Sequence, residues 1–315
     1  MKYIIKKFFT LIITLLIVTI FTFVAFQVIP GDSAITALGM DATEDQLQNY
    51  REELGLDESI PVQYAIWLSN TIKGDFGTSL QYMETPVSKL ISDRLPVTVC
   101  LAVLSFAIII LVSLPLGILA AKHRGKWLDR TISILTQVSM AIPSFFLGMI
   151  LSLIFGIALK WFTPGKYISY SDNFAGFIRF LIFPSIAIAI PKIAMLVKFL
   201  RSSILRQMKS DYVRTAKSKG MKENDILYRH VLKNALIPVV TFLAMMLADI
   251  LAGTVLIEQV FNLPGLGRTL LNAVSNRDFP VAQIIILYIA AIVVIINFVV
   301  DVIYKWIDPR VSANY

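Results

Sequence analysis

Few residues in this sequence have the types and spacing that catalysis or metal binding needs. His123 and His230 stand apart, without an HExxH pattern or nearby cysteines, and Cys100 is the single cysteine. No G-x-x-x-x-G-K-[ST] run occurs, so the chain lacks the phosphate-binding loop of P-loop ATPases. Without a nucleophile paired with a base or a cluster of metal ligands, we expect no catalytic residues, no metal site and no cofactor bound by this chain.

Ionisable residues inside long apolar runs are the next candidates, because charge in lipid is costly and often marks a pathway. Asp249, two turns before Glu258, lies well within such a run, whereas Asp301 lies near the end of another. Two roles stay open for Asp249: it lines a pathway, or it forms a structural ion pair, for which a residue of a partner subunit is one candidate. A carrier driven by an ion gradient would use such carboxylates, usually in two repeats, and no repeat is visible.

The polar stretch KSDYVRTAKSKGMKENDILYRHVLKNAL, residues 209–236, has the pattern of two short helices. Ser210 is placed to cap a first helix that runs to about Lys219, and Gly220 to end it in the left-handed conformation. The segment from Glu223 to Asn234 predicts a second helix, with acidic residues in its first turn.

The first of these helices predicts a docking surface. Tyr212, Ala216 and Gly220 recur at four-residue spacing, with Arg214 and Lys217 beside them. Such a small-residue face lets another protein approach closely. A basic amphipathic helix lying on lipid phosphates fits the same pattern, and the spacing leaves both interpretations open.

The elements that must position these residues are membrane-spanning helices. Hydrophobic residues make up 57% of the chain and charged residues 16%, which does not suit a surface in water. Apolar runs long enough for a helix to cross a core of about 30 Å occur at 8–29, 97–121, 132–158, 178–198, 235–257 and 281–304. These runs are apolar all round, unlike β-barrel strands, so we predict an all-α polytopic membrane protein with about six spans.

Lys and Arg residues predict the orientation of the chain. They gather at 2–7, 122–130, 201–233 and 305–310, segments that six spans place on one face, which we expect to be cytoplasmic with both termini. The net charge of +8 lies beside the spans, where topology and anionic membrane lipid account for it, so we expect no nucleic-acid partner. We divide the chain into an N-terminal end with the first span (1–29), an external helical segment (30–95), a five-helix core (96–305) that includes loop 199–234, and a cytoplasmic tail (306–315).

Local signals predict structure in the external segments and in the spans. Thr43 with Gln46 forms a capping box for a helix that ends before Gly55, and a second helix covers 62–72 and ends at Gly74. A later external turn is either gate-like or a rigid cap, and it contains Glu258, Phe261, Pro264, Gly265 and Gly267. Breaks in spans two, three and four are expected at Pro115, Pro143, Pro184 and Pro191.

The stretch YVRTAKSKGMKENDILYRHVLKNALIP resembles the cytoplasmic loop signature of binding-protein-dependent ABC importer permeases, in their oligopeptide and dipeptide branch. Further segments in the same order are similar to first-permease subunits of peptide importers: KKFFTLIITLLIVTIFTFVAFQVIPGD, KGDFGTSL, PVSKLISDRLPVTVCLA, EQVFNLPGLGRTLLNAVSNRDFP and NFVVDVIYKWIDPRV. The resemblance covers nearly the whole chain and implies the type I ABC importer permease fold.

The resemblance also implies a role for the loop. In that family its short helix inserts into a groove on a cytoplasmic ATPase, and here the contact would include Tyr212, Arg214, Thr215, Ala216, Lys219 and Gly220. The general family has Glu-Ala-Ala where this chain has Arg214-Thr215-Ala216, so only the alanine and the following glycine match the broad pattern.

The function implied is that of a channel-forming subunit of an ATP-driven importer in the bacterial cytoplasmic membrane. An external solute-binding protein would deliver peptides, a second homologous permease would complete the channel, and two ATPase subunits would use ATP and Mg²⁺. Nickel, a metal chelate or another small solute is the alternative cargo, and an ion-gradient-driven carrier is the alternative mechanism.

Overall fold

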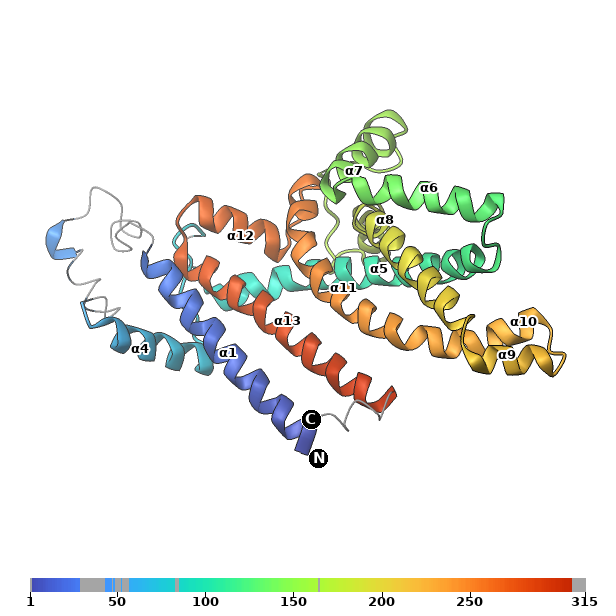
Figure 1. Cartoon of the computed structure of the whole chain (residues 1–315). Coiled ribbons are helices and arrows are strands. Elements are labelled where there is room, and N and C mark those ends of the chain that lie inside the picture. Colours follow the sequence, from blue (N-terminus) through green and yellow to red (C-terminus); the bar gives the residue numbers. More distant parts are fainter. Residues whose placement is uncertain are drawn as a thin grey trace. The chain divides into compact units, whose positions relative to one another are not determined.

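The computed structural model describes residues 2–28, 43–46, 48, 52, 57–82, 85–163 and 165–307, and within them all the regular elements are helices (Figure 1). In chain order they are α1 (Lys2–Val28), α4 (Ile60–Lys73), α5 (Val87–Lys122), α6 (Trp127–Ala141), α7 (Ser144–Leu151), η1 (Ser152–Ala158), α8 (Phe174–Gln207), α9 (Asp211–Ser218), α10 (Glu223–Asp225), η2 (Ile226–Val231), α11 (Leu232–Val260), α12 (Leu266–Ser275) and α13 (Phe279–Ile307). The elements η1 and η2 are π-helical turns. The predicted all-α class is confirmed.

Five of these helices are long and apolar enough to cross a membrane, and a sixth span is a bent pair. The five are 5–28, 87–122, 174–207, 223–260 and 279–300, which match predicted spans one, two, four, five and six. The helix over 223–260 joins α10, η2 and α11, so the second loop helix runs directly into the fifth span.

The third predicted span is the one that differs from a continuous helix. Its two halves, Trp127–Ala141 and Ser144–Ala158, meet at 98°. Ile142 and Pro143 between them both have extended backbone. Proline has no N–H and disfavours helical geometry in the residue before it, which explains the break. Pro184 and Pro191, where breaks were also expected, lie inside the continuous α8, and Pro115 lies inside the continuous α5.

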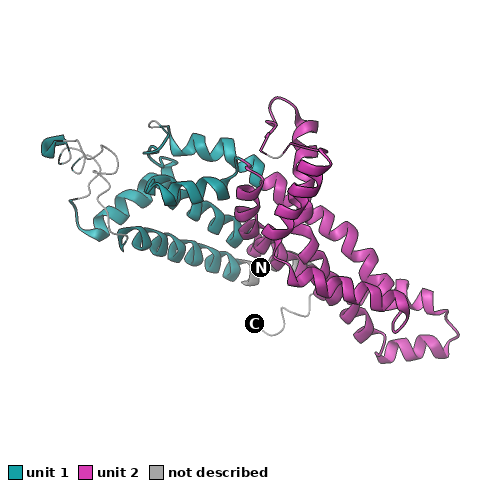
Figure 2. Cartoon of the chain, turned by 90° about the horizontal axis from the view of Figure 1, so that it is seen from above, with its two compact units in different colours: residues 1–98, 264–295 teal, residues 99–263, 296–315 magenta. Residues whose placement is uncertain are grey.

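The chain divides into two compact units, coloured separately in Figure 2. Unit 1 contains residues 1–98 and 264–295, and unit 2 contains residues 99–263 and 296–315. Helices α5 and α13 are each divided between the two units. The boundaries predicted at 29/30, 95/96 and 305/306 stay a prediction.

Unit 1 has its hydrophobic core where the start of α5 meets α12 and the first turns of α13. The core includes Val87 and Ile91 of α5, Leu266 of α12 and Val281 and Ile285 of α13, all buried. A buried polar contact adds to it, because the fully buried Asp278 just before α13 accepts a hydrogen bond from the hydroxyl of Ser79. The loop after α4 is thereby joined to the beginning of α13.

Both helix signals predicted in the segment between the first two spans are found in unit 1. The backbone N–H of Thr43 donates to Gln46 Oε1 at 2.9 Å, and the N–H of Gln46 donates to Thr43 Oγ1 at 3.4 Å, which is the predicted capping box. Of the rest of that helix, residues 48 and 52 are described and are helical, while the other positions to Gly55 lie outside the described residues. The second helix is α4, and Gly74 ends it with a φ of +83°.

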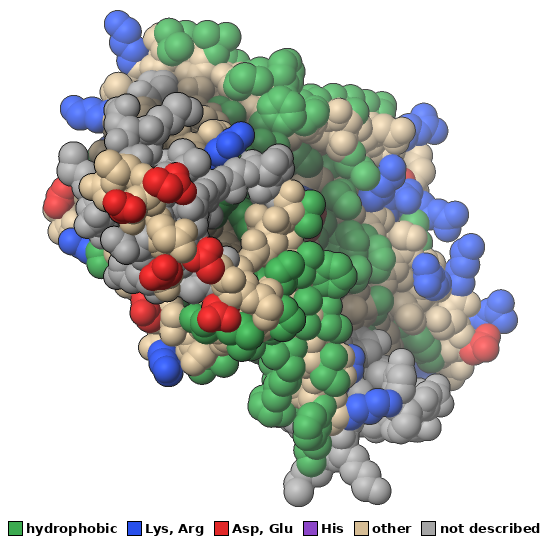
Figure 3. Space-filling view, turned by 90° about the vertical axis from the view of Figure 1, so that its left-hand side faces the viewer, with side chains coloured by type: hydrophobic (Ala, Val, Ile, Leu, Met, Phe, Trp, Pro, Cys, Tyr) green, Lys and Arg blue, Asp and Glu red, His purple; other side chains and the backbone are tan. Residues whose placement is uncertain are grey.

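Helix α8 is the central element of unit 2, where it packs against α6, α7 and α11. The C-terminal part of α5 also lies close to α8, since a Cβ on Gly117 would be 2.8 Å from Leu200 Cδ2. Many large hydrophobic side chains stay on the surface of both units, among them Phe21 and Leu111 at 72% exposure. Figure 3 shows hydrophobic side chains over much of one face. Surfaces of this kind suit contact with lipid or with other subunits.

Candidate functional site

The loop between α8 and α11 folds as the sequence predicts over its first half. Helix α9 follows Ser210, and Gly220 has a φ of +76°. The N–H of Met221 donates to the carbonyl of Ala216 at 3.2 Å and the N–H of Gly220 to that of Lys217 at 2.9 Å, which satisfies the helix end. Ser210 is at the N-cap position of α9, but its hydroxyl oxygen does not accept the expected hydrogen bond, and the hydroxyl donates to Gln207 Oε1 at 3.4 Å.

The outward face of α9 is not the one expected from the four-residue spacing. Tyr212, Arg214, Thr215, Lys219 and Gly220 are exposed, but the side chain of Ala216 is buried. The docking role of these residues stays a prediction. The expectation that Tyr212, Ala216 and Gly220 form one accessible face is wrong, because Ala216 is buried.

The physical reason is that α9 buries its own apolar stripe. Val213 and Ala216 are three residues apart and lie on the same side, and α9 packs against η2, where Ile226 and Leu227 are buried. Ala216 therefore lies on the buried side of α9, toward η2, and the polar and basic residues of α9 remain accessible.

The accessible surface of α9 and the turn after it is mostly basic. Arg214, Lys217, Lys219 and Lys222 are all exposed. Arg214 pairs with Asp211 at 3.4 Å, and Lys217 pairs with Glu223 at 3.5 Å. Exposed pairs contribute about 0–1 kcal/mol each, so these cations can exchange partners at little cost.

Sequence reasoning missed an ion pair that joins α8 to α6 shortly before this loop begins. Arg201, near the end of α8, donates from Nε to Asp129 Oδ1 at 2.7 Å and from Nη2 to Asp129 Oδ2 at 2.8 Å. The N–H of Gly125 donates to the same Oδ2 at 2.8 Å, and the Asp129 side chain is 6% exposed. The available signal was that Asp129 is the one acidic residue in the basic segment 122–130.

A hydrogen bond joins α8 and α11, the two helices that flank the loop. The buried hydroxyl of Ser203 on α8 donates to the carbonyl of Ala235 on α11 at 2.8 Å. Because α11 also continues directly from η2, both ends of the loop are tied to long helices. The loop that contains α9 therefore begins and ends at two long helices that contact each other.

Asp249 on α11 forms an ion pair with Lys192 on α8. The structural partner is thus within this chain, in a neighbouring helix. The two side chains differ in exposure: 19% for Lys192 and 60% for Asp249. Whether Asp249 also lines a pathway stays a prediction.

The predicted external turn is divided between the two units. Glu258 and Phe261 belong to unit 2 and are fully buried, and the Phe261 ring lies 6.1 Å from that of Phe162. Pro264, Gly265 and Gly267 belong to unit 1, where Gly265 precedes α12 and Gly267 is buried within it. Inside unit 2, the tight packing of Phe261 favours the rigid cap over a gate.

Comparisons with known proteins agree along the whole chain. Residues 113–313 match the family described as binding-protein-dependent transport system inner membrane component, and residues 1–102 match the N-terminal part of the membrane component of such systems. The chain is 37% identical to a probable peptide ABC transporter permease protein, y4tP, of Sinorhizobium fredii, over 98% of both chains.

Two further relatives are of similar length. A putative peptide transport system permease protein of Brucella abortus is 40% identical over 99% of both chains. The oligopeptide transport system permease protein AppB of Bacillus subtilis is 36% identical over 98% of this chain and 99% of its own.

Proposed function

Because this chain belongs to the family of inner membrane components of binding-protein-dependent transport systems, the permeases of ABC importers, we propose that it forms part of the channel of an ATP-driven peptide importer. The cargo is inferred from relatives named as peptide and oligopeptide permeases, which align over almost the full length. The energy source must be a separate subunit that binds ATP and Mg²⁺, because this sequence has no phosphate-binding loop.

The observation that carries this proposal is the construction of the loop around α9. An exposed, mostly basic short helix stands on an apolar contact with η2, and both of its ends are fixed to long membrane helices. This construction suits a helix that is pushed by another protein. A helix that merely rested on the membrane would turn its apolar residues toward lipid, whereas Val213 and Ala216 of α9 are buried within the chain.

In the proposed mechanism an ATPase subunit contacts Tyr212, Arg214, Thr215, Lys219 and Gly220 from the cytoplasm. Closure of the ATPases on ATP displaces α9, and the end of α8 follows because the chain runs from α8 into α9. The Arg201–Asp129 pair then makes α6 move with α8. Helix α11 moves with the same loop, because η2 continues into it. The permease then exchanges an outward-open for an inward-open state, whose relative stability the ATPases set.

The remaining partners of the proposed assembly are a second homologous permease and an external solute-binding protein. The exposed apolar helices leave ample surface for the second permease and for lipid. The assembly belongs in the bacterial cytoplasmic membrane, with both termini of this chain in the cytoplasm. Nickel, a metal chelate or another small solute is the alternative cargo for the same machine.

The proposal is tested by isolating this chain, tagged at its C-terminus, from its native membrane under mild conditions and identifying what co-purifies. We expect a second permease and one or two P-loop ATPases in stoichiometric amounts. With the solute-binding protein added, ATP hydrolysis should rise with di- or oligopeptides and not with nickel chelates. A chain that reproducibly purifies alone would contradict the proposal and favour an ion-gradient-driven carrier.

A further inference from the structure

Helix α4, in the segment after the first span, lies beside membrane-spanning helices within unit 1. Its Tyr64 hydroxyl forms a 2.8 Å hydrogen bond with Thr19 of α1, and the rings of Tyr64 and Trp67 lie 5.5 and 5.7 Å from that of Phe23. Thr19 and Phe23 both belong to the apolar span Ile5–Val28. These contacts are therefore at the depth of the membrane and not above it.

The depth of α4 follows from the positions of its contacts along α1. Gln63 accepts a hydrogen bond from Gln27, one residue before the end of the span, whereas Tyr64 reaches Thr19. Gln27 and Thr19 are eight residues apart, which is about 12 Å along an α-helix. A helix with its side chains is about 10–12 Å across, so α4 occupies the last 12 Å or so of the span.

Helix α13 gives the same depth independently. Phe76, three residues after α4, packs edge-to-face on Tyr288 at a centroid distance of 5.9 Å. Tyr288 is nine residues after Phe279, where the last span begins, or about 13 Å along the helix. Both neighbouring spans thus place α4 and its following loop inside the same leaflet.

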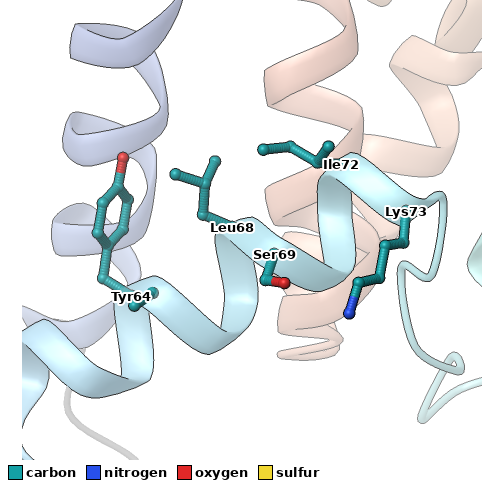
Figure 4. A pocket seen from close by; sticks show the side chains of 6 residues that line it. Tyr64, Leu68, Ser69, Ile72 and Lys73 are labelled. Atoms are coloured by element: carbon teal, nitrogen blue, oxygen red, sulfur yellow. The ribbon is translucent and has the colours of Figure 1, made fainter.

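The side chains of α4 are arranged for this position. Tyr64, Ala65, Leu68 and Ile72 form one flank, which borders a groove of about 400 Å³ together with Ser69 and Lys73. In Figure 4, Tyr64, Leu68 and Ile72 lie on one side of α4, and the side chains of Ser69 and Lys73 lie on the other. Such an amphipathic helix with Tyr and Trp is typical of the boundary between headgroups and acyl chains.

Beyond the contacts of Tyr64 with α1, the apolar flank of α4 stays largely exposed within the part of the chain that the structure describes. Ile72 is 77% exposed, and α4 contains no buried residue. At the start of α4 the carbonyl of Ser59 accepts from the N–H groups of Val62 and Gln63, and at its end Gly74 and Asp75 donate to carbonyls of the last turn. These internal hydrogen bonds reduce the cost of placing the helix ends in lipid.

We propose that α4 is an interfacial membrane helix, and that its groove holds the acyl chain of a phospholipid while Lys73 extends to the headgroups. A long Lys side chain can keep its ammonium group at the phosphates while its stem lies along apolar surface. The inference rests on contacts with the two spans and does not depend on the cargo or on the ATPases.

The test compares neighbouring residues of α4 in the assembled transporter in phospholipid vesicles, in a Cys100→Ala background. Ile72→Cys and Lys73→Cys are reacted with a membrane-impermeant maleimide, with Glu58→Cys as a water-exposed reference and Leu111→Cys as a span reference. We expect Lys73→Cys to react faster than Ile72→Cys, because it lies on the other side of α4. Ile72→Cys should react about tenfold more slowly than Glu58→Cys, like Leu111→Cys, because lipid excludes the reagent.

A second measurement identifies what covers Ile72. A phospholipid with a photoreactive diazirine in its acyl chain should label the peptide that contains α4, both with and without the solute-binding protein. Rapid reaction at Ile72→Cys would overturn the proposal. Slow reaction without lipid labelling, or protection that needs the solute-binding protein, would assign the groove to a protein and overturn it as well.

Discussion

Two ion pairs join α8 to its neighbours in unit 2, and they differ in geometry and exposure. Near the loop, Arg201 and Asp129 are joined by two short hydrogen bonds, and Gly125 adds a third to the buried carboxylate. In the middle of α8, Lys192 meets Asp249, whose side chain is 60% exposed. The first pair fixes one geometry, because a bidentate guanidinium–carboxylate contact is directional. The second is a point-charge contact whose carboxylate stays open to another partner.

The difference between the two ion pairs predicts different roles for the loop end and the middle of α8. If a displacement of α9 is to reach the membrane, the loop end of α8 must move together with α6, to which the Arg201–Asp129 pair joins it. The middle of α8 faces α11, where the transported solute or a second subunit can meet Asp249. We therefore predict that substitutions at the Arg201–Asp129 pair are poorly tolerated, and that substitutions at the Lys192–Asp249 pair are tolerated better.

The largest effect is expected from Asp129→Ala. It leaves the guanidinium of Arg201 without its partner in a site where the carboxylate was buried, at a cost of about 2–3 kcal/mol. We expect a lower midpoint of thermal unfolding of the purified complex and nearly complete loss of peptide uptake. The double variant Asp129→Ala with Arg201→Ala should regain part of the stability. A double variant whose loss of stability equals the sum of the losses of the two single variants would mean that the pair is not coupled.

The second prediction concerns Gly220→Val, which tests the loop without touching the Arg201–Asp129 pair. A β-branched residue at a φ of +76° is strained by about 1–2 kcal/mol, although nothing lies within 4 Å of its Cβ. We expect normal assembly of the membrane subunits with peptide-stimulated ATP hydrolysis greatly reduced. Gly74→Val is the matched control, because Gly74 has a φ of +83° with equally open space but ends α4. Normal coupling in Gly220→Val would contradict the docking role.

A smaller effect is expected from Asp249→Asn. Lys192 then keeps a polar neighbour but loses its counter-charge, which costs about 1 kcal/mol, or roughly fivefold in an equilibrium. If the pair is only structural, the exchange of Lys192→Asp with Asp249→Lys should restore uptake of all peptides. A change in the preference among acidic, neutral and basic peptides that persists in the exchanged pair would show that Asp249 meets the cargo.

The smallest effect is expected from Arg214→Ala. The pair with Asp211 is fully exposed and contributes about 0–1 kcal/mol, so stability should not change measurably. The affinity of the ATPase for the membrane subunits should fall by a few-fold, and more at low than at high salt, because salt screens the contact. Unchanged affinity at low salt would place Arg214 outside the contact.

Most of the fold could be predicted from the sequence because lipid imposes a minimum length on every apolar run. The exception was the third span, where Pro143 produced a sharp break while Pro184 and Pro191 did not. All three prolines remove a backbone donor, but α8 is enclosed by α6, α7 and α11. The surroundings that keep a helix continuous through a proline are tertiary, so the sequence does not reveal them.

The candidate site was predictable where the signal was local. The bounds of α9 and the left-handed Gly220 follow from residues within a few positions of each other. The burial of Ala216 depends on η2, which folds back onto α9, and the partner of Asp249 lies 57 positions earlier in the chain. Contacts of this kind have no periodicity to detect.

The docking role of α9 is tested most directly by cross-linking from Thr215→Cys, in a Cys100→Ala background, within the native membrane. The proposed function predicts that a short thiol-to-amine reagent joins this chain to a P-loop ATPase, identified by mass spectrometry, while Trp161→Cys in another exposed connection gives no such product. A Thr215→Cys chain that reacts only with lipid, or with no protein, would contradict the docking role and favour a helix that rests on the membrane surface.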